Sequence, residues 1–201
     1  APVAGSATQP AGLAGVAYTE PCTPENASGA LAKGKLRLVL GTGGAGGVFF
    51  PYGSGLADII TENLENAEAN AEVTGGSVDN MKLVQAGDAD IGMATMDSAY
   101  NAINGLDIYA ETGAVPACAL ATLYTSFVHV VALEGSGIET LADMKGKRIS
   151  VGSVGSSTEG IADRLLETAG LDPSAGITRS NLSVSESVNA LKDEKIDAFF
   201  W

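Results

Sequence analysis

The chain has 201 residues, of which 24 are Asp or Glu and 11 are Lys or Arg, so its formal net charge is −13. This length fits one large domain or two small ones, and an apolar fraction of 45% is enough to form a core. A chain this acidic is not expected to bind nucleic acid or anionic lipid through its overall field. No apolar run approaches the roughly 18 residues that a membrane-spanning helix needs.

Residues 1–34 are rich in Ala, Gly, Pro, Ser and Thr and show no hydrophobic periodicity. This composition predicts a flexible leader or tether. The leader contains Cys22, and the other cysteine of the chain is Cys118. Export would favour a Cys22–Cys118 disulfide, and two separate thiols are the alternative that the sequence leaves open. Two cysteines and one histidine, without metal-ligand spacing, predict no metal site.

The first structured unit begins with an apolar run at residues 36–40, which predicts a strand, and continues into a glycine-rich loop at residues 41–47. Apolar residues at helical spacing follow, and a helix is predicted to start near Pro51, because proline favours the first turn. Such a loop lets the backbone approach a ligand, and the helix directs N–H groups toward the same point. The pattern predicts a site for a carboxylate or phosphate, with a plain glycine turn as the alternative.

The same loop matches the dinucleotide-binding pattern G-x-G-x-x-G at Gly41, Gly43 and Gly46. The match is weak because the predicted helix begins several residues too late and no acidic residue closes the second strand. The loop also lacks the Gly-Lys-Ser/Thr ending of a P-loop. No cofactor is therefore predicted.

Further elements follow the same strand and helix signals along the chain. In the first unit they are a strand at 71–74, a helix from Ser77 to Gly87, a strand at 90–94 and a helix starting at 96. Residues 119–124 and 127–133 are apolar strand candidates. Ser136 and Glu139 form a capping box that predicts a short helix. Then come a strand at 149–151, a glycine and serine loop at 152–158 followed by a helix, a strand at 177–182, a helix capped by Ser183 and a strand at 196–201.

This order of elements repeats within the chain. Gly152 follows Gly41 by 111 residues, and Asp197 follows Asp90 by 107. Near-equal offsets predict two similar α/β lobes, divided near Phe127, rather than one larger sheet. Because ligands of α/β sheets bind at the carboxyl ends of the strands, the two loops predict a cleft that holds a small anion between the lobes.

Several motifs in this order resemble those of the TAXI-type solute receptors, the extracytoplasmic binding subunits of tripartite ATP-independent periplasmic (TRAP) transporters. The motifs are residues 41–52, 74–80, 96–100, 141–148 and 155–159, and the similarity extends over about residues 35–201. The resemblance implies an α/β, two-lobed periplasmic-binding-protein fold (type II-like), with residues 1–34 as leader, 35–126 as lobe I and 127–201 as lobe II. The family continues past residue 201, so lobe II is expected to be incomplete.

The resemblance also implies a function. A monomeric receptor is expected to capture glutamate, glutamine, 2-oxoglutarate or a related carboxylate and to deliver it to the TRAP membrane permease subunits. It is expected outside the cytoplasm, in the periplasm or at the cell surface, tethered through its leader. An enzyme is not expected, because the chain has no Gly-x-Ser-x-Gly elbow and no H-E-x-x-H motif. A small-molecule enzyme on an α/β fold and a surface or antigenic module without small-ligand transport are the alternative classes.

The expected ligand-binding residues combine backbone donors with hydroxyl, amide and carboxylate groups. They are Gly43, Gly44, Gly46, Gly47, Tyr52, Ser77, Asn80, Asp97, Ser156, Ser157, Thr158 and Glu159. Structural roles are the alternatives: Tyr52 as a helix anchor, and Ser77, Asn80, Asp97 and the Ser156–Glu159 pair as helix caps. His129 is expected to be a core or hinge residue.

The charges predict a preference among ligands. Two helix N-termini and the glycine loop are expected to attract a carboxylate, while Arg37 and Arg148 are expected to lie at the wrong ends of their strands to clamp it. If Asp97 or Glu159 faces the cleft, glutamate or glutamine should bind better than succinate or 2-oxoglutarate, because an acidic side chain pairs with the ligand ammonium.

Overall fold

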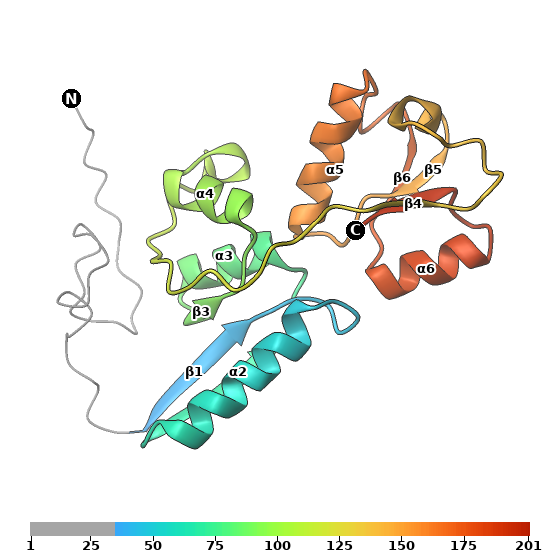
Figure 1. Ribbon diagram of the computed structural model, residues 1–201. Coiled ribbons are helices and arrows are strands. Elements are labelled where there is room, and N and C mark those ends of the chain that lie inside the picture. The colour runs from blue at the N-terminus through green and yellow to red at the C-terminus, as the bar shows by residue number, and fades with distance from the viewer. Residues whose placement is uncertain (1–34) are drawn as a thin grey trace, which may run out of the picture.

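The computed structural model describes residues 35–201, in which two separate sheets each carry their own helices (Figure 1). The predictions for the leader and for Cys22 lie outside the described residues, so the disulfide with Cys118 stays a prediction. Among the described residues, no helix is long and apolar enough to span a membrane.

The first sheet has the strand order β2-β1-β3, and its pairs are parallel. Its strands are β1 (Leu36–Gly41), β2 (Ala67–Glu72) and β3 (Ile91–Gly92). Its helices are α2 (Phe49–Asn63), α3 (Ser77–Ala86) and α4 (Met96–Asn104), followed by the short 3-10 helix η1 (Asp107–Tyr109). Leu40, Ala57 and Ala69 form the core between α2 and the sheet, and a second cluster around Met81 and Tyr109 joins α3 to α4.

The second sheet has the order β4-β7-β5-β6. Its strands are β4 (Val130–Ala132), β5 (Arg148–Ser150), β6 (Thr178–Ser180) and β7 (Ala198–Phe200), and its helices are η2 (Leu141–Met144), α5 (Ser157–Thr168) and α6 (Val184–Lys192). β5 is parallel to β6 and β7, whereas β4 is antiparallel to β7. Ile149, Val151, Leu166 and Phe200 are buried in its main core.

The predicted repeat has a counterpart in the sheets. β1 lies between β2 and β3, and β5 lies in the same way between β6 and β7. The Asp90 carboxylate accepts the backbone N–H of Val39 at 2.9 Å, and the Asp197 carboxylate accepts that of Arg148 at 2.7 Å. Each unit therefore uses the same acid to hold its central strand, 107 residues apart in sequence. The exact lobe boundary near Phe127 stays a prediction.

The strand expected at residues 71–74 is wrong in its bounds, because β2 is Ala67–Glu72. Ala, Glu and Asn have low strand propensity, so residue types do not indicate a strand there. All six residues of β2 pair with β1, and Ala69 packs into the core beside Leu40. Pairing and packing thus place a strand where intrinsic propensity does not.

Two further predictions about local structure are wrong. Residues 119–124 form no strand, and they run as an irregular segment between the two units. The capping box at Ser136 does not open a helix, because Gly137 adopts a positive φ of 74° that interrupts the turn. Thr140 and Asp143 form the capping box instead, at the start of η2.

His129 lies where the chain enters the second sheet. Its backbone N–H donates to the Trp201 carbonyl at 2.5 Å, and its carbonyl accepts the Trp201 N–H at 2.8 Å. Its side chain is exposed, so of the two roles expected for it the core position is wrong, while the hinge position stays a prediction. This backbone pairing extends the contact of β4 with β7 by one residue. It thereby holds the irregular segment between the two units against the end of the second unit.

Candidate functional site

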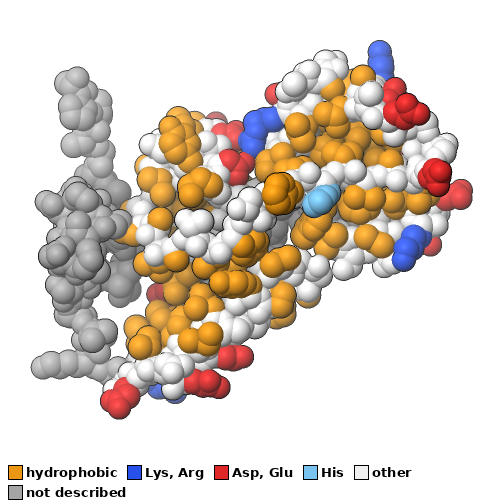
Figure 2. Space-filling model, in the orientation of Figure 1, with side chains coloured by type: hydrophobic (Ala, Val, Ile, Leu, Met, Phe, Trp, Pro, Cys, Tyr) orange, Lys and Arg blue, Asp and Glu red, His pale blue; other side chains and the backbone are white. Residues whose placement is uncertain are grey.

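A cleft of about 1350 Å³ lies where the two units meet, and both units line it. The first unit contributes the loop after β1, the start of α3 and the residues between β3 and α4. The second contributes the loop after β5, the start of α5 and Ser183 and Val184 at the start of α6. Figure 2 shows hydrophobic side chains gathered in the middle of this face, around the pale blue His129. The irregular segment 116–128 forms another wall.

The two units touch directly at the start of α3. The Gly155 carbonyl, from the loop after β5, accepts the backbone N–H groups of Val78 and Asp79 at 3.0 and 3.1 Å. A Cβ on Gly75 would overlap the Val154 carbonyl oxygen, so glycine permits this approach. Because Gly155 occupies these donors, the N-terminus of α3 is not available to a ligand in this arrangement. The two helix N-termini expected at the ligand are those after the loops at 41–47 and 152–158, which belong to α2 and α5, and that expectation stays a prediction.

An ion pair also joins the two units. The Asp97 carboxylate in the first turn of α4 lies 2.7 Å from the Arg164 guanidinium on α5. Both side chains are substantially exposed, so the pair contributes little stability by itself. Asp97 lines the cleft as expected, but its charge is already balanced by Arg164.

All four predicted glycines of the loop after β1 line the cleft. A Cβ on Gly46 would overlap the Ser185 hydroxyl, and a Cβ on Gly47 would lie 3.1 Å from the Trp201 ring. These two glycines thus make room for the second unit. A Cβ on Gly44, in contrast, would meet no atom within 4 Å, so the space beside its Cα is open, although its carbonyl accepts the Gly47 N–H at 2.9 Å.

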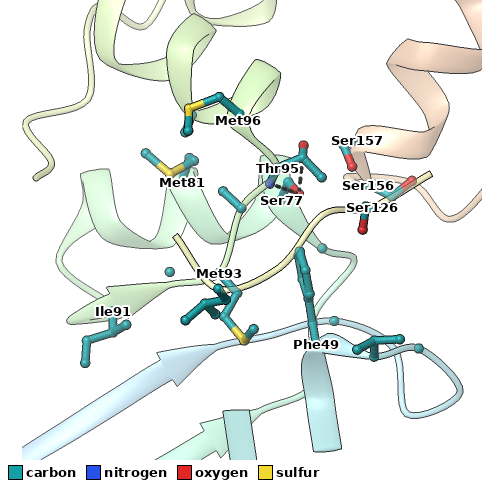
Figure 3. Close-up of a pocket in the computed structure, with 18 of the residues that line it drawn as sticks. Phe49, Ser77, Met81, Ile91, Met93, Thr95, Met96, Ser126, Ser156 and Ser157 are labelled. Carbon is teal, nitrogen blue, oxygen red and sulfur yellow. Dashed lines mark hydrogen bonds between the residues drawn. The ribbon is translucent and has the colours of Figure 1, made fainter. Parts of the chain in front are cut away.

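Hydroxyl groups gather on one side of the cleft (Figure 3). The Ser77 side chain is 1% exposed, and its hydroxyl accepts the Thr95 N–H at 3.1 Å. Ser156 caps α5 by accepting the Glu159 N–H at 3.3 Å, and it donates to the Ser153 carbonyl at 2.7 Å. Ser77 is not a cap, because Gly76 holds the N-cap position of α3 at a φ of 124°.

Ser157 and Thr158, the two residues after Ser156, lie in the first turn of α5 and line the cleft. A helix N-terminus carries partial positive charge, so this end of the cleft favours a negative or polar group. Ser156, Ser157 and Thr158 therefore all line the cleft, and their role in binding stays a prediction.

Three predicted ligand residues lie outside the lining of the cleft. The Asn80 side chain is buried, and its amide donates to the Thr42 and Met93 carbonyls at 2.6 and 2.7 Å. This pattern ties the end of β1 to that of β3. Tyr52 packs its ring against Tyr124, with the centroids 5.8 Å apart.

Glu159 is the third. Its carboxylate accepts from Arg179 and from the Asn181 amide, each at 2.9 Å. Arg179 also pairs with Asp163. The carboxylate thus joins α5 to β6 and the loop that follows, and it is satisfied within the second unit rather than directed at a ligand.

The cleft contains no basic side chain among its described lining residues, and its two acidic ones, Asp90 and Asp97, are engaged elsewhere. Burial, together with the neighbouring Tyr52, raises the pKa of the Tyr124 phenol. Tyr124 therefore stays protonated at neutral pH and is a neutral hydrogen-bond donor. Arg148 pairs with Asp197 and does not line the cleft, as expected.

Sequence reasoning missed the apolar part of the cleft. Met81, Met93 and Met96 and the segment 116–128 line it, with Phe49 at the start of α2. Phe127 is 76% exposed and Leu120 79% exposed, which is unusual for such large apolar side chains. The signal available in the sequence is the pair of apolar segments at 119–124 and 127–133, which predict strands.

The comparisons with known proteins fall on the same part of the chain. The model of the NMT1-like family matches residues 40–201. Among solved structures, the chain resembles an alkanesulfonate-binding protein from Xanthomonas axonopodis pv. citri bound to MOPS, with a TM-score of 0.54 and 21% identity. The match covers 84% of this chain and 55% of that one.

Two other solved structures show the same likeness. A binding protein component of an ABC phosphonate transporter from Pseudomonas aeruginosa matches with a TM-score of 0.59 and 12% identity, over 83% of this chain and 57% of that one. A cysteine-binding protein from Campylobacter jejuni matches with a TM-score of 0.51 and 15% identity, over 81% and 62%. The chain thus has an α/β periplasmic-binding-protein-like fold and spans roughly three fifths of the length of these proteins.

Proposed function

The chain belongs to the NMT1-like family, and from that premise we propose that it is a solute-binding receptor that encloses a small carboxylate between its two units. The observation that carries the proposal is the cleft, because both units line it and hydroxyl groups from both gather at one of its sides. Small-molecule sites are typically concave and largely apolar, with a few converging polar groups. This cleft has that character.

The loop after β5 and the start of α5 are the proposed carboxylate site. Ser156 caps the N-terminus of a 12-residue helix and donates its hydroxyl proton to the Ser153 carbonyl, so the proposed side-chain donors are Ser157 and Thr158. The backbone N–H groups and the dipole at this helix end also favour an anion. Gly44 offers open backbone on the other side. With no arginine in the lining, the carboxylate would be held by hydroxyl and N–H donors alone.

The finer assignments rest on the resemblance of the motifs to the TAXI-type receptors. They are glutamate, glutamine or 2-oxoglutarate as candidate ligands, TRAP permease subunits as the partner that receives the ligand, and a location in the periplasm or at the cell surface. The lobe ranges 35–126 and 127–201 belong to this proposal too. An enzyme is not proposed, since no described pair of side chains in the cleft combines a nucleophile with a base.

A pair of serine variants tests the proposal. Ser157→Ala removes a hydroxyl from the proposed carboxylate site, whereas Ser54→Ala removes one that donates to the Phe50 carbonyl on α2 and does not line the cleft. Isothermal titration calorimetry with a panel of amino and 2-oxo acids should give about tenfold weaker binding for Ser157→Ala only. Equal affinity in both variants would remove Ser157 from the site. Failure of every carboxylate at millimolar concentration would end the proposal.

A further inference from the structure

The cleft is divided into a polar end and an apolar end (Figure 3). Hydroxyl groups of Ser77, Thr95, Ser126, Ser156 and Ser157 lie toward one side of the view. The side chains of Met81, Ile91, Met93 and Met96 lie toward the other. Phe49 reaches up from the start of α2 between the two groups. A ligand that fills the cleft therefore meets hydroxyls at one end and hydrocarbon and thioether surface at the other.

The apolar end suits a hydrocarbon body. Met81 and Met93 are 4% and 5% exposed and form its base, whereas Met96 is 72% exposed at its rim. Methionine side chains are flexible and polarisable, so they adapt to branched or ring-shaped groups. Each methylene buried against such a surface strengthens binding roughly fourfold.

The same end cannot stabilise a second anion. None of the described lining residues is Lys, Arg or His, and Asp97 adds a carboxylate of its own. Arg164 does not line the cleft, and its charge is already used in the ion pair with Asp97. A second ligand carboxylate at the apolar end would lose water without gaining a partner, which is strongly unfavourable.

Building on the proposed function, we infer that the ligand has a single carboxylate, held at the hydroxyl end, and an apolar branched or aromatic body that lies against Met81, Met93 and Met96. The ligand class is thus an apolar amino acid or 2-oxo acid. A dicarboxylate such as glutamate or 2-oxoglutarate is disfavoured. This class is narrower than the related carboxylates that the resemblance implies. It also disfavours glutamate, which the resemblance names as a candidate ligand.

Two matched ligand pairs test the inference on the unaltered chain. Leucine is compared with glutamate, and 4-methyl-2-oxopentanoate with 2-oxoglutarate, by isothermal titration calorimetry. In each pair, the apolar member ends in an isopropyl group where the dicarboxylate ends in a carboxymethyl group. The apolar member of at least one pair should bind about tenfold tighter or more.

A charge variant tests the position of the ligand body. Met96→Lys adds an ammonium at the rim of the apolar end, and Ile59→Lys adds the same charge on α2, at a side chain that is 59% exposed and does not line the cleft. Met96→Lys should shift the preference toward the dicarboxylate by roughly tenfold. Ile59→Lys should leave the preference unchanged.

The outcomes separate this inference from the proposed function. Tighter binding of the apolar members, together with the shift in Met96→Lys alone, supports the inference. Equal or tighter binding of the dicarboxylates overturns it while the receptor proposal stands. An apolar preference that Met96→Lys does not change overturns the placement of the body at this end. If no member of either pair binds while another carboxylate of the panel does, the inference fails and the receptor proposal stands. If no carboxylate of the panel binds, both fail.

Discussion

Asp90 and Asp197 show how much one acidic side chain determines in each unit. Each accepts the N–H of a residue on the central strand, and Asp197 also accepts from the Arg148 side chain at 3.1 and 2.5 Å. Hydrogen bonds from Arg148 lower the pKa of the Asp197 carboxyl. A lowered folded-state pKa stabilises the fold above the unfolded pKa, and this stabilisation is lost as the pH falls through the folded value.

Asp197→Asn tests this linkage. At pH 7 the variant should lose about 1 kcal/mol of unfolding free energy, because a charge-assisted hydrogen bond becomes a neutral one. The difference should shrink as the pH falls below 3.8, the ordinary value for this carboxyl, so it should be smaller at pH 2 than at pH 7. Urea unfolding at both pH values measures it.

Asp193→Asn is the matched control for that experiment. Asp193 pairs with Lys195, and the two side chains are 57% and 72% exposed, so the substitution should change stability by less than about 0.5 kcal/mol. A pH-independent loss in Asp197→Asn would contradict the role of the carboxylate charge.

Residue types alone do not separate cleft-lining residues from structural ones. Ser156, Ser157 and Thr158, predicted as ligand residues, line the cleft, and their contact with a ligand stays a prediction. Asn80 and Glu159 have the same hydrogen-bonding chemistry, yet their groups are satisfied by the ends of strands and by Arg179. Which partner such a side chain meets depends on contacts distant in the chain, and one sequence carries no signal for them.

Helices were predictable because their periodicity and caps are local. The Ser183–Glu186 capping box opens α6, and Gly87 ends α3 in the left-handed region, as expected. Strands depend on distant partners, which explains the wrong bounds of β2 and the strand wrongly predicted at 119–124. The repeat was visible because it repeats local signals.

The loops that join strands to helices bring the two units into contact, and Gly75→Ala tests this. The added Cβ would overlap the Val154 carbonyl oxygen and should push the start of α3 away from the loop after β5. Gly155 then loses its hydrogen bonds to Val78 and Asp79. The arrangement in which the two units touch at the start of α3 should therefore become less populated. Ligand affinity should fall about tenfold, in proportion to the competent fraction.

The distance between labels on the two units, measured by electron paramagnetic resonance, reports the arrangement directly. Gly44→Ala is the matched control, because its Cβ would lie in open space in the same cleft. It should leave the distance distribution unchanged. An unchanged distribution in Gly75→Ala, with intact helix content by circular dichroism, would contradict the close approach at this position.

At the scale of the whole molecule, the chain has a net charge of −13, and its cleft is the proposed site of a carboxylate. The two fit together because salt screens the overall charge beyond about 8 Å, while the helix N-terminus of α5 acts at contact distance. The two sheets, ordered β2-β1-β3 and β4-β7-β5-β6, each present a loop and the start of a helix at the cleft, so a single chain lines it from both sides.

The location of ligand binding is the most direct test of the central claim that the cleft between the two units is a receptor site. Backbone amide chemical shifts of the isotopically labelled chain, recorded during titration with 4-methyl-2-oxopentanoate, measure this location. The largest changes should fall on Gly44, Ser77, Ser157 and Thr158, with parallel changes in both units. Changes confined to one unit, or centred on the surface around Asp163 and Asp172, would contradict the claim.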